Sequence, residues 1–203
     1  MKKRRFLPLF CLLAMLLGGV IAWYRTGWGF AREVGTYEKE IRLEVVSTAE
    51  SWLGANEKDG SHREIIDIYN AHSPLARGYK VTYEDAWCAA FDSVVAIQCD
   101  LTDIIPTECG CTPQIERFRE MGCWVEDDAY VPLPGDLIYY HWDCLEMGDC
   151  QKRPDHVGIV VGTAGPFIKV IEGNKDNDVS YRYTKVDAPG IRGYGVPSYE
   201  NTL

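Results

Sequence analysis

The sequence has few basic residues beyond its first five positions. Those positions hold four of the 21 Lys and Arg residues and no acid, so the remainder carries 17 basic and 30 acidic residues, a formal charge of 17 − 30 = −13. A surface of this sign repels nucleic acids and anionic polymers at distances beyond direct contact. Nucleic-acid binding is therefore disfavoured, and attachment to an anionic polymer must come from a cleft or a membrane anchor.

The sequence also lacks internal repeats and any Ser-, Gly- or Pro-rich stretch that would serve as a linker. If an N-terminal targeting segment is removed, about 160–180 residues remain. That length is enough for one domain with a sizeable core. A separate recognition module is excluded, so recognition and any catalysis share one fold.

The N-terminal segment has the composition of an export signal. Four basic residues precede an apolar run over 6–24, and small residues at Ala22 and Ala31 offer cleavage positions. A run of about 19 residues lies between the length of a signal-peptide core and that of a minimal spanning helix. Segment 1–31 is thus a removed signal peptide or an anchor on the outer face of the cytoplasmic membrane, with the basic residues inside. A short connector is expected over 32–43.

Hydrophobic periodicity divides the rest of the chain into helices followed by strands. Apolar residues recur at helical spacing in four segments: 42–53, 64–69, 86–99 and 112–121. From residue 134 the pattern is typical of strands, which we expect over 136–142, 156–163, 167–172, 179–185 and 192–197. This order predicts an α+β domain in which N-terminal helices pack on an antiparallel sheet of about five strands.

Three elements of this layout carry residues suited to thiol chemistry. Cys88 lies in the expected first turn of helix 86–99, where the helix dipole and a nearby imidazolium lower a thiol pKa. His156 starts a strand 68 residues later, and Glu172 and Asn174 end the next strand 16 and 18 residues after the histidine. Either residue type alone is usually structural. The order cysteine, histidine, polar orienter is that of papain-like hydrolases.

On these residues the chain resembles the CHAP family, the cysteine, histidine-dependent amidohydrolases and peptidases related to the NlpC/P60 peptidases. The resemblance runs from about Glu44 to Tyr199. It is carried by Ala-Trp-Cys-Ala-Ala-Phe at 86–91, Pro-Leu-Pro-Gly-Asp-Leu-Ile-Tyr at 132–139, Asp-His-Val-Gly at 155–158, Ile-Glu-Gly-Asn at 171–174 and Ile-Arg-Gly-Tyr-Gly at 191–195. It implies a papain-like catalytic domain over 44–200 that cleaves an amide of bacterial peptidoglycan, either the muramoyl–alanine bond or a peptide bond of the stem or cross-bridge.

The resemblance also implies roles for the polar residues. Cys88 is the nucleophile, His156 the base, and Glu172 and Asn174 the orienting pair. Glu172 could bond the imidazole Nδ1 and fix its tautomer, or Asn174 could do so instead or bind substrate. No cofactor or metal is implied: the calcium-binding aspartates that some relatives carry just ahead of the nucleophile have no counterpart in segment 78–82.

Two aromatic residues near the nucleophile are candidates for the cleft. The backbone N–H of Cys88 is a natural oxyanion donor, and a second donor is needed. Tyr83 is a candidate by position, and Trp87 is a candidate for the cleft wall. Each could equally be a packed aromatic.

The remaining cysteines of the exported part leave more than one arrangement open. Three disulfides would suit an exported domain, and Cys144 with Cys150, which bracket a loop between predicted strands, is the best single pair. A zinc site on Cys109 and Cys111 with a third cysteine, Cys99 or Cys123, is the competing interpretation, although one-residue spacing is poor for structural zinc. Free thiols are a third possibility.

Two other functions stay open beside wall hydrolysis. One is a non-catalytic wall-binding or scaffold module that keeps the fold. The other is a thiol hydrolase or transamidase that acts on a different amide.

Overall fold

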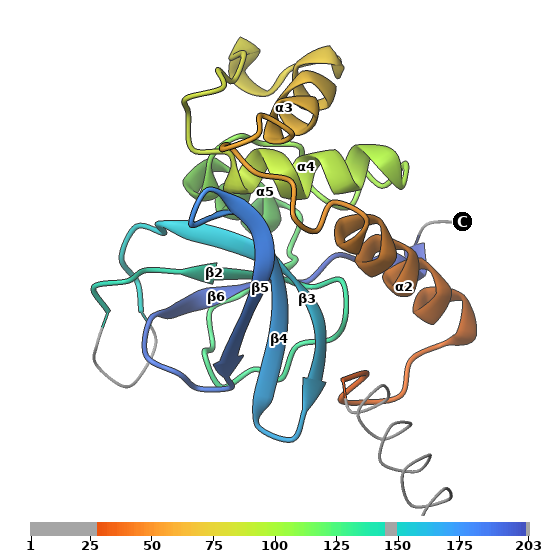
Figure 1. Cartoon of the computed structure of the whole chain (residues 1–203). Coiled ribbons are helices and arrows are strands. Elements are labelled where there is room, and N and C mark those ends of the chain that lie inside the picture. The colour runs from red at the N-terminus through yellow and green to blue at the C-terminus, as the bar shows by residue number, and fades with distance from the viewer. Residues whose placement is uncertain (1–27, 145–149, 202–203) are drawn as a thin grey trace, which may run out of the picture.

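The computed structural model describes residues 28–144 and 150–201. In this part of the chain four α-helices precede and pack against an antiparallel sheet (Figure 1). The helices are α2 (Thr36–Glu50), α3 (His62–Ala71), α4 (Cys88–Gln98) and α5 (Cys111–Glu120), with short 3-10 turns η1 (Ala76–Gly78) and η2 (Tyr199–Asn201). The predicted α+β class is confirmed.

The sheet has six strands in the order β1-β6-β2-β3-β4-β5, and all neighbouring strands are antiparallel. Their bounds are β1 (Trp124–Val125), β2 (Leu137–Tyr140), β3 (His156–Ala164), β4 (Phe167–Lys175), β5 (Asp178–Lys185) and β6 (Ile191–Gly195). The five expected strands are all present. The prediction missed β1, because two residues are too few to show an alternating pattern.

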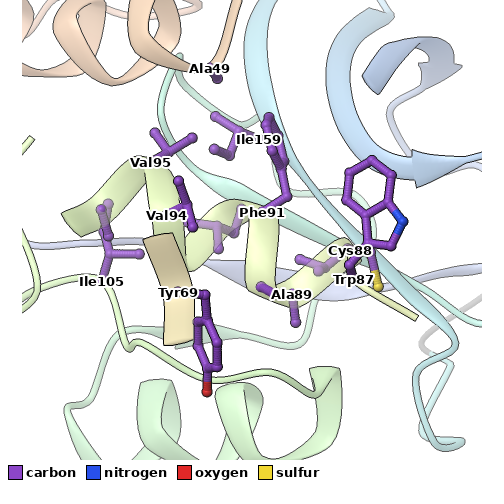
Figure 2. Close-up of a cluster of buried hydrophobic side chains, with 14 of the residues drawn as sticks. Ala49, Tyr69, Trp87, Cys88, Ala89, Phe91, Val94, Val95, Ile105 and Ile159 are labelled. Carbon is purple, nitrogen blue, oxygen red and sulfur yellow. The ribbon is translucent and has the colours of Figure 1, made fainter. Parts of the chain in front are cut away.

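Helix α4 is the centre of the hydrophobic core. Its residues from Cys88 to Ala96 are all buried, since it packs on β3 and β4 on one side and on α2 and α3 on the other. Figure 2 shows its apolar side chains gathered with those of the neighbouring elements. The first residue of α4 is therefore held rigidly against the sheet.

Two glycines of the sheet make this close packing possible. A Cβ at Gly173 on β4 would collide with Phe91 and would lie 2.9 Å from Trp87 Cζ3, so only glycine lets α4 approach here. A Cβ at Gly158 on β3 would lie 2.5 Å from Glu172 Cγ. Both glycines belong to the Asp-His-Val-Gly and Ile-Glu-Gly-Asn segments, and they bring the nucleophile helix and the two polar strands together.

The segment expected as a connector, 32–43, instead contains the first two turns of α2. Its Arg42 is almost fully buried and donates hydrogen bonds to Asp136 Oδ1 at 2.7 Å and to the carbonyl of Pro134 at 2.9 Å. The Arg42 guanidinium also lies over the Tyr199 ring, 4.4 Å from its centroid. Buried ion pairing, rather than an apolar stripe, thus stabilises this part of the helix. Hydrophobic periodicity therefore predicted the start of the helix too late.

The expected targeting segment lies outside the described residues apart from positions 28–31. There Gly29 exchanges two backbone hydrogen bonds with Thr163 near the end of β3, at 3.1 and 3.0 Å. None of the helices in the described part of the chain is both long enough and apolar enough to cross a membrane.

Replacing Arg42 by Met should destabilise the fold by about 3–5 kcal/mol, because it leaves the buried Asp136 carboxylate without its cation. The measurement is urea denaturation of the purified chain. Arg117→Met is the matched control: its ion pair with Glu120 is exposed and should contribute less than about 1 kcal/mol. Equal losses in the two variants would contradict the anchoring role of Arg42.

Candidate active site

Cys88 is the first residue of α4 and lies at the floor of a pocket of about 400 Å³. Only 6% of the residue is exposed, and the pocket is its route to solvent. The first N–H groups of a helix have no partners within the helix, and the positive end of the helix dipole stabilises an anion there. The fold therefore places the thiol where a thiolate is favoured.

His156, Glu172 and Arg182 form a chain of charged contacts across three neighbouring strands. His156 Nε2 donates to Glu172 Oε2 at 3.0 Å, and the other carboxylate oxygen of Glu172 accepts from Arg182 Nε at 2.6 Å. Glu172 is completely buried. A buried carboxylate needs such partners, because burial without them would be costly.

The thiol and the imidazole shift each other's protonation. A hydrogen bond with Cys111 is the largest cause that lowers the pKa of the Cys88 thiol, and His156 and the Ala89 N–H add to it, while burial opposes them. Burial alone would lower the pKa of His156, but its interactions with Cys88 and Glu172 outweigh burial and raise the pKa to about 10. Together these shifts favour a thiolate–imidazolium pair.

Of the two expected orienting residues, Glu172 contacts the imidazole of His156, through a different ring nitrogen from the one expected. Glu172 holds the imidazole through Nε2 and not through Nδ1, so Nδ1 is the nitrogen left for the side of Cys88. Asn174 has a φ of 56° where the β4–β5 pairing becomes irregular, and no hydrogen bond joins it to His156 within the described residues. The register shift after Glu172 turns Asn174 away from that role.

A second carboxyl, that of Asp92, lies one turn beyond Cys88 on α4. It is buried, and neither of its oxygens has a hydrogen-bond partner among the described residues. Burial, followed by the negative charge of Cys88, raises the pKa of Asp92 well above its usual value. The neutral carboxyl is thus favoured at Asp92, which limits its opposition to the thiolate. A carboxyl on an otherwise apolar helix was the sequence signal that could have identified it.

The two aromatic candidates do not have the expected roles. The Tyr83 hydroxyl donates to Asp67 Oδ1 at 2.8 Å, so it is engaged at α3 and not at the nucleophile. Trp87 is fully buried, and its Nε1 donates to Glu57 Oε1 at 3.0 Å (Figure 2 shows it next to Cys88). Trp87 is therefore a core residue and not a cleft wall. Their orientation depends on partners distant in sequence, which the local pattern does not show.

Sequence analysis missed several side chains at or near the pocket. Arg77, Arg153 and Cys111 line it together with Cys88, and Cys111 Sγ lies 3.8 Å from Cys88 Sγ. Trp142 is exposed, and its ring centroid lies 5.8 Å from that of His156. The pocket thus carries side chains of both charge signs, since Asp85 and Asp155 line it beside the two arginines, and the ring of Trp142 lies next to His156 rather than in that lining.

The other cysteines adopt only part of the expected arrangement. A disulfide joins Cys144 to Cys150, the pair singled out from the sequence. Of the arrangements left open, three disulfides are not formed, because the remaining described cysteines are free. The zinc alternative is not assembled either: in the described part of the chain no three His, Cys, Asp or Glu side chains are grouped to hold a metal ion. The thiols of Cys99 and Cys123 instead form hydrogen bonds with the hydroxyl groups of Thr48 and Ser198, respectively.

No family model, curated protein or solved structure matches the chain. The resemblance to the CHAP family therefore rests on the five short sequence segments alone.

The thiolate–imidazolium pair predicts the pH dependence of alkylation. Because the pKa of Cys88 is lowered, its labelling by iodoacetamide should remain fast at about pH 7, where an ordinary thiol is mostly protonated. In His156→Ala the cation is lost, the thiol pKa rises, and the rate at that pH should fall at least about tenfold. Mass spectrometry of the labelled peptides measures both rates.

Cys99 is the internal control for this experiment. Burial raises the pKa of its thiol, so its labelling should become fast only at alkaline pH. A pH profile of Cys88 that His156→Ala leaves unchanged would show that the imidazole does not activate the thiol.

Proposed function

We propose that this chain is a CHAP-type thiol hydrolase with a papain-like fold that cleaves an amide bond of bacterial peptidoglycan. The observation that carries the proposal is that Cys88, which lines a solvent-connected pocket, interacts with His156, whose imidazole Glu172 holds. Three residues picked for their chemistry, far apart in sequence, meet at one place with the charges that amide cleavage needs.

The reaction is acyl transfer in two steps. The Cys88 thiolate attacks the carbonyl carbon, and the developing oxyanion faces the N–H groups at the start of α4. His156 donates its proton to the leaving amine as the C–N bond breaks, which leaves a thioester. The neutral imidazole then takes a proton from water, the hydroxide displaces Cys88, and the carboxylic acid product leaves.

The contents of the pocket support a peptide stem as substrate. Stem peptides of the wall carry free carboxylates, and the guanidinium groups of Arg77 and Arg153 line the pocket, beside Asp85 and Asp155, as candidate partners for them. The exposed ring of Trp142 next to His156 gives an apolar contact for a side chain or sugar ring.

The proposed compartment is outside the cytoplasmic membrane. The basic and apolar N-terminal segment supports export, as a cleaved signal peptide or a retained anchor. The Cys144–Cys150 disulfide suits an oxidising compartment.

The observations favour an enzyme over a scaffold module of the same fold. A scaffold has no use for a completely buried glutamate paired to a histidine that is itself largely buried, since such charges are costly to desolvate. The thiol hydrolase with a different amide substrate differs only in what the pocket accepts, so substrate tests separate it.

The test is digestion of purified peptidoglycan by the wild-type chain and by Cys88→Ala, with the released muropeptides read by mass spectrometry. We expect fragments that depend on Cys88, and new amino termini identify the bond. A folded wild-type protein that is alkylated at Cys88 yet releases nothing would rule out these wall substrates and favour another amide.

Glu172→Gln and Asn174→Ala test the orienting residue. Glu172→Gln removes the charge that helps raise the pKa of His156 to about 10, so kcat should fall about 100-fold or more. The imidazolium is lost as pH rises through its pKa, so the alkaline limb of the rate–pH profile should move to lower pH. Asn174→Ala should keep the limb in place and change kcat by less than about threefold. The reverse ranking would assign the role to Asn174.

A further inference from the structure

Two sulfur atoms are in contact at the floor of the pocket. Cys88 Sγ and Cys111 Sγ lie 3.8 Å apart, and the two residues are the first of α4 and of α5. Both are free cysteines and both line the pocket. A hydrogen bond with Cys88, burial and the negative charge of Cys88 raise the pKa of the Cys111 thiol well above its usual value. Cys111 is therefore a thiol that donates to a neighbouring thiolate.

We propose that Cys88 and Cys111 form a reversible redox pair, in which Cys111 traps an oxidised Cys88 as a disulfide. The proposal goes beyond amide hydrolysis, because forming the disulfide needs an oxidant and no amide substrate. While the disulfide exists, Cys88 has no thiolate and the site is inactive. Reduction by a thiol restores both sulfurs.

Cys111 is the thiol placed to do this. A disulfide bond is about 2.05 Å long, so the two sulfurs must approach by about 1.8 Å, a movement that side-chain rotation and a small shift of a helix start can supply. Cys109, two residues earlier, also lines the pocket, but its sulfur accepts a hydrogen bond from Arg77 at 3.3 Å. Within the described residues no sulfur other than that of Cys111 contacts Cys88.

The chemistry balances with a peroxide as the oxidant. The Cys88 thiolate attacks one peroxide oxygen, an S–O bond forms, the O–O bond breaks, and the departing hydroxide takes up a proton to become water. The sulfur of Cys111 then attacks that of Cys88: the S–S bond forms, the S–O bond breaks, and the hydroxide leaves with the proton of Cys111 as water. Two thiols thereby supply the two electrons that reduce one peroxide to two waters.

The position of the pair explains why trapping would matter. A thiolate that reaches solvent through a pocket is the form of cysteine most open to oxidation, and a second peroxide would convert its sulfenic acid irreversibly to sulfinic acid. A resolving thiol in contact with it intercepts the first product. An exported enzyme with an activated thiol meets oxidants directly, so the contact would preserve a nucleophile that could not be replaced.

The test treats the reduced full chain with hydrogen peroxide, alkylates the remaining thiols, and maps disulfides by mass spectrometry. Trypsin alone does not suffice, because no Lys or Arg occurs between positions 81 and 116 and four cysteines stay in one peptide. Cleavage after Phe91 and after Glu108 separates Cys88 from Cys99 and from the Cys109–Cys111 segment. Fragmentation then distinguishes Cys109 from Cys111.

We expect a Cys88–Cys111 link in the wild type that dithiothreitol reverses, with nearly all the Cys88 thiol recovered. In Cys111→Ser, Cys88 should instead accumulate as sulfinic acid, and the recoverable fraction should fall several-fold. Cys109→Ser is the matched control, a cysteine of the same loop and pocket, and it should behave as the wild type. Near-ultraviolet circular dichroism checks that the variants are folded.

Two outcomes would overturn the proposal: a wild type that accumulates Cys88 sulfinic acid as fast as Cys111→Ser, or a link from Cys88 to Cys109 instead. If Cys111→Ser does not fold, the wild-type map and Cys109→Ser decide between these results. No readout here uses hydrolysis, so failure of the redox pair and failure of the proposed hydrolase function remain distinct.

Discussion

The buried carboxylate of Glu172 is the interaction on which the site depends. With no access to water, it must be compensated within the protein, and its two oxygens take His156 and Arg182 from the two adjacent strands. This requirement fixes the register of β3, β4 and β5 around it, and Gly158 gives its side chain room. Breaking such a buried pair on one side typically costs about 3–5 kcal/mol. Stability and chemistry thus share one set of contacts.

The nucleophile follows from the same packing. Because Gly173 admits α4 to close contact with β4, the first residue of α4 faces the histidine that Glu172 holds. The helix dipole, the imidazolium and the Cys111 thiol all favour a thiolate, and burial favours the neutral carboxyl of Asp92 over an opposing charge. An activated thiol here results from how a helix meets a sheet.

The sequence was informative where regular periodicity or chemistry determined the outcome. Apolar stripes and alternation predicted four helices and five of the six strands, and the order of Cys88, His156 and Glu172 predicted which distant side chains would meet. Contacts that depend on the path of an irregular segment were not predictable from the sequence. Cys111 reaches Cys88 because of the path of the irregular segment 99–110, which has no period to interpret.

Side-chain direction was the other property hidden from the sequence. Tyr83 and Trp87 stand close to the nucleophile in the chain, but hydrogen bonds to Asp67 and Glu57 turn them away from it. Likewise α2 begins earlier than its apolar stripe, because Arg42 binds both the buried Asp136 and Glu38 in the polar first turn. Tertiary partners override local pattern in each case.

The two ends of strand β3 have different partners. Its first residue, His156, belongs to the site, whereas Thr163 near its other end exchanges hydrogen bonds with Gly29, one of the first residues that the structure describes. Seven residues of extended strand separate the two, about 23 Å at the usual rise per residue. If the protein were attached to a surface through the segment before Gly29, the candidate site would accordingly lie away from the point of attachment. The strand would act as a rigid spacer that sets how deep into a surrounding mesh the pocket could reach.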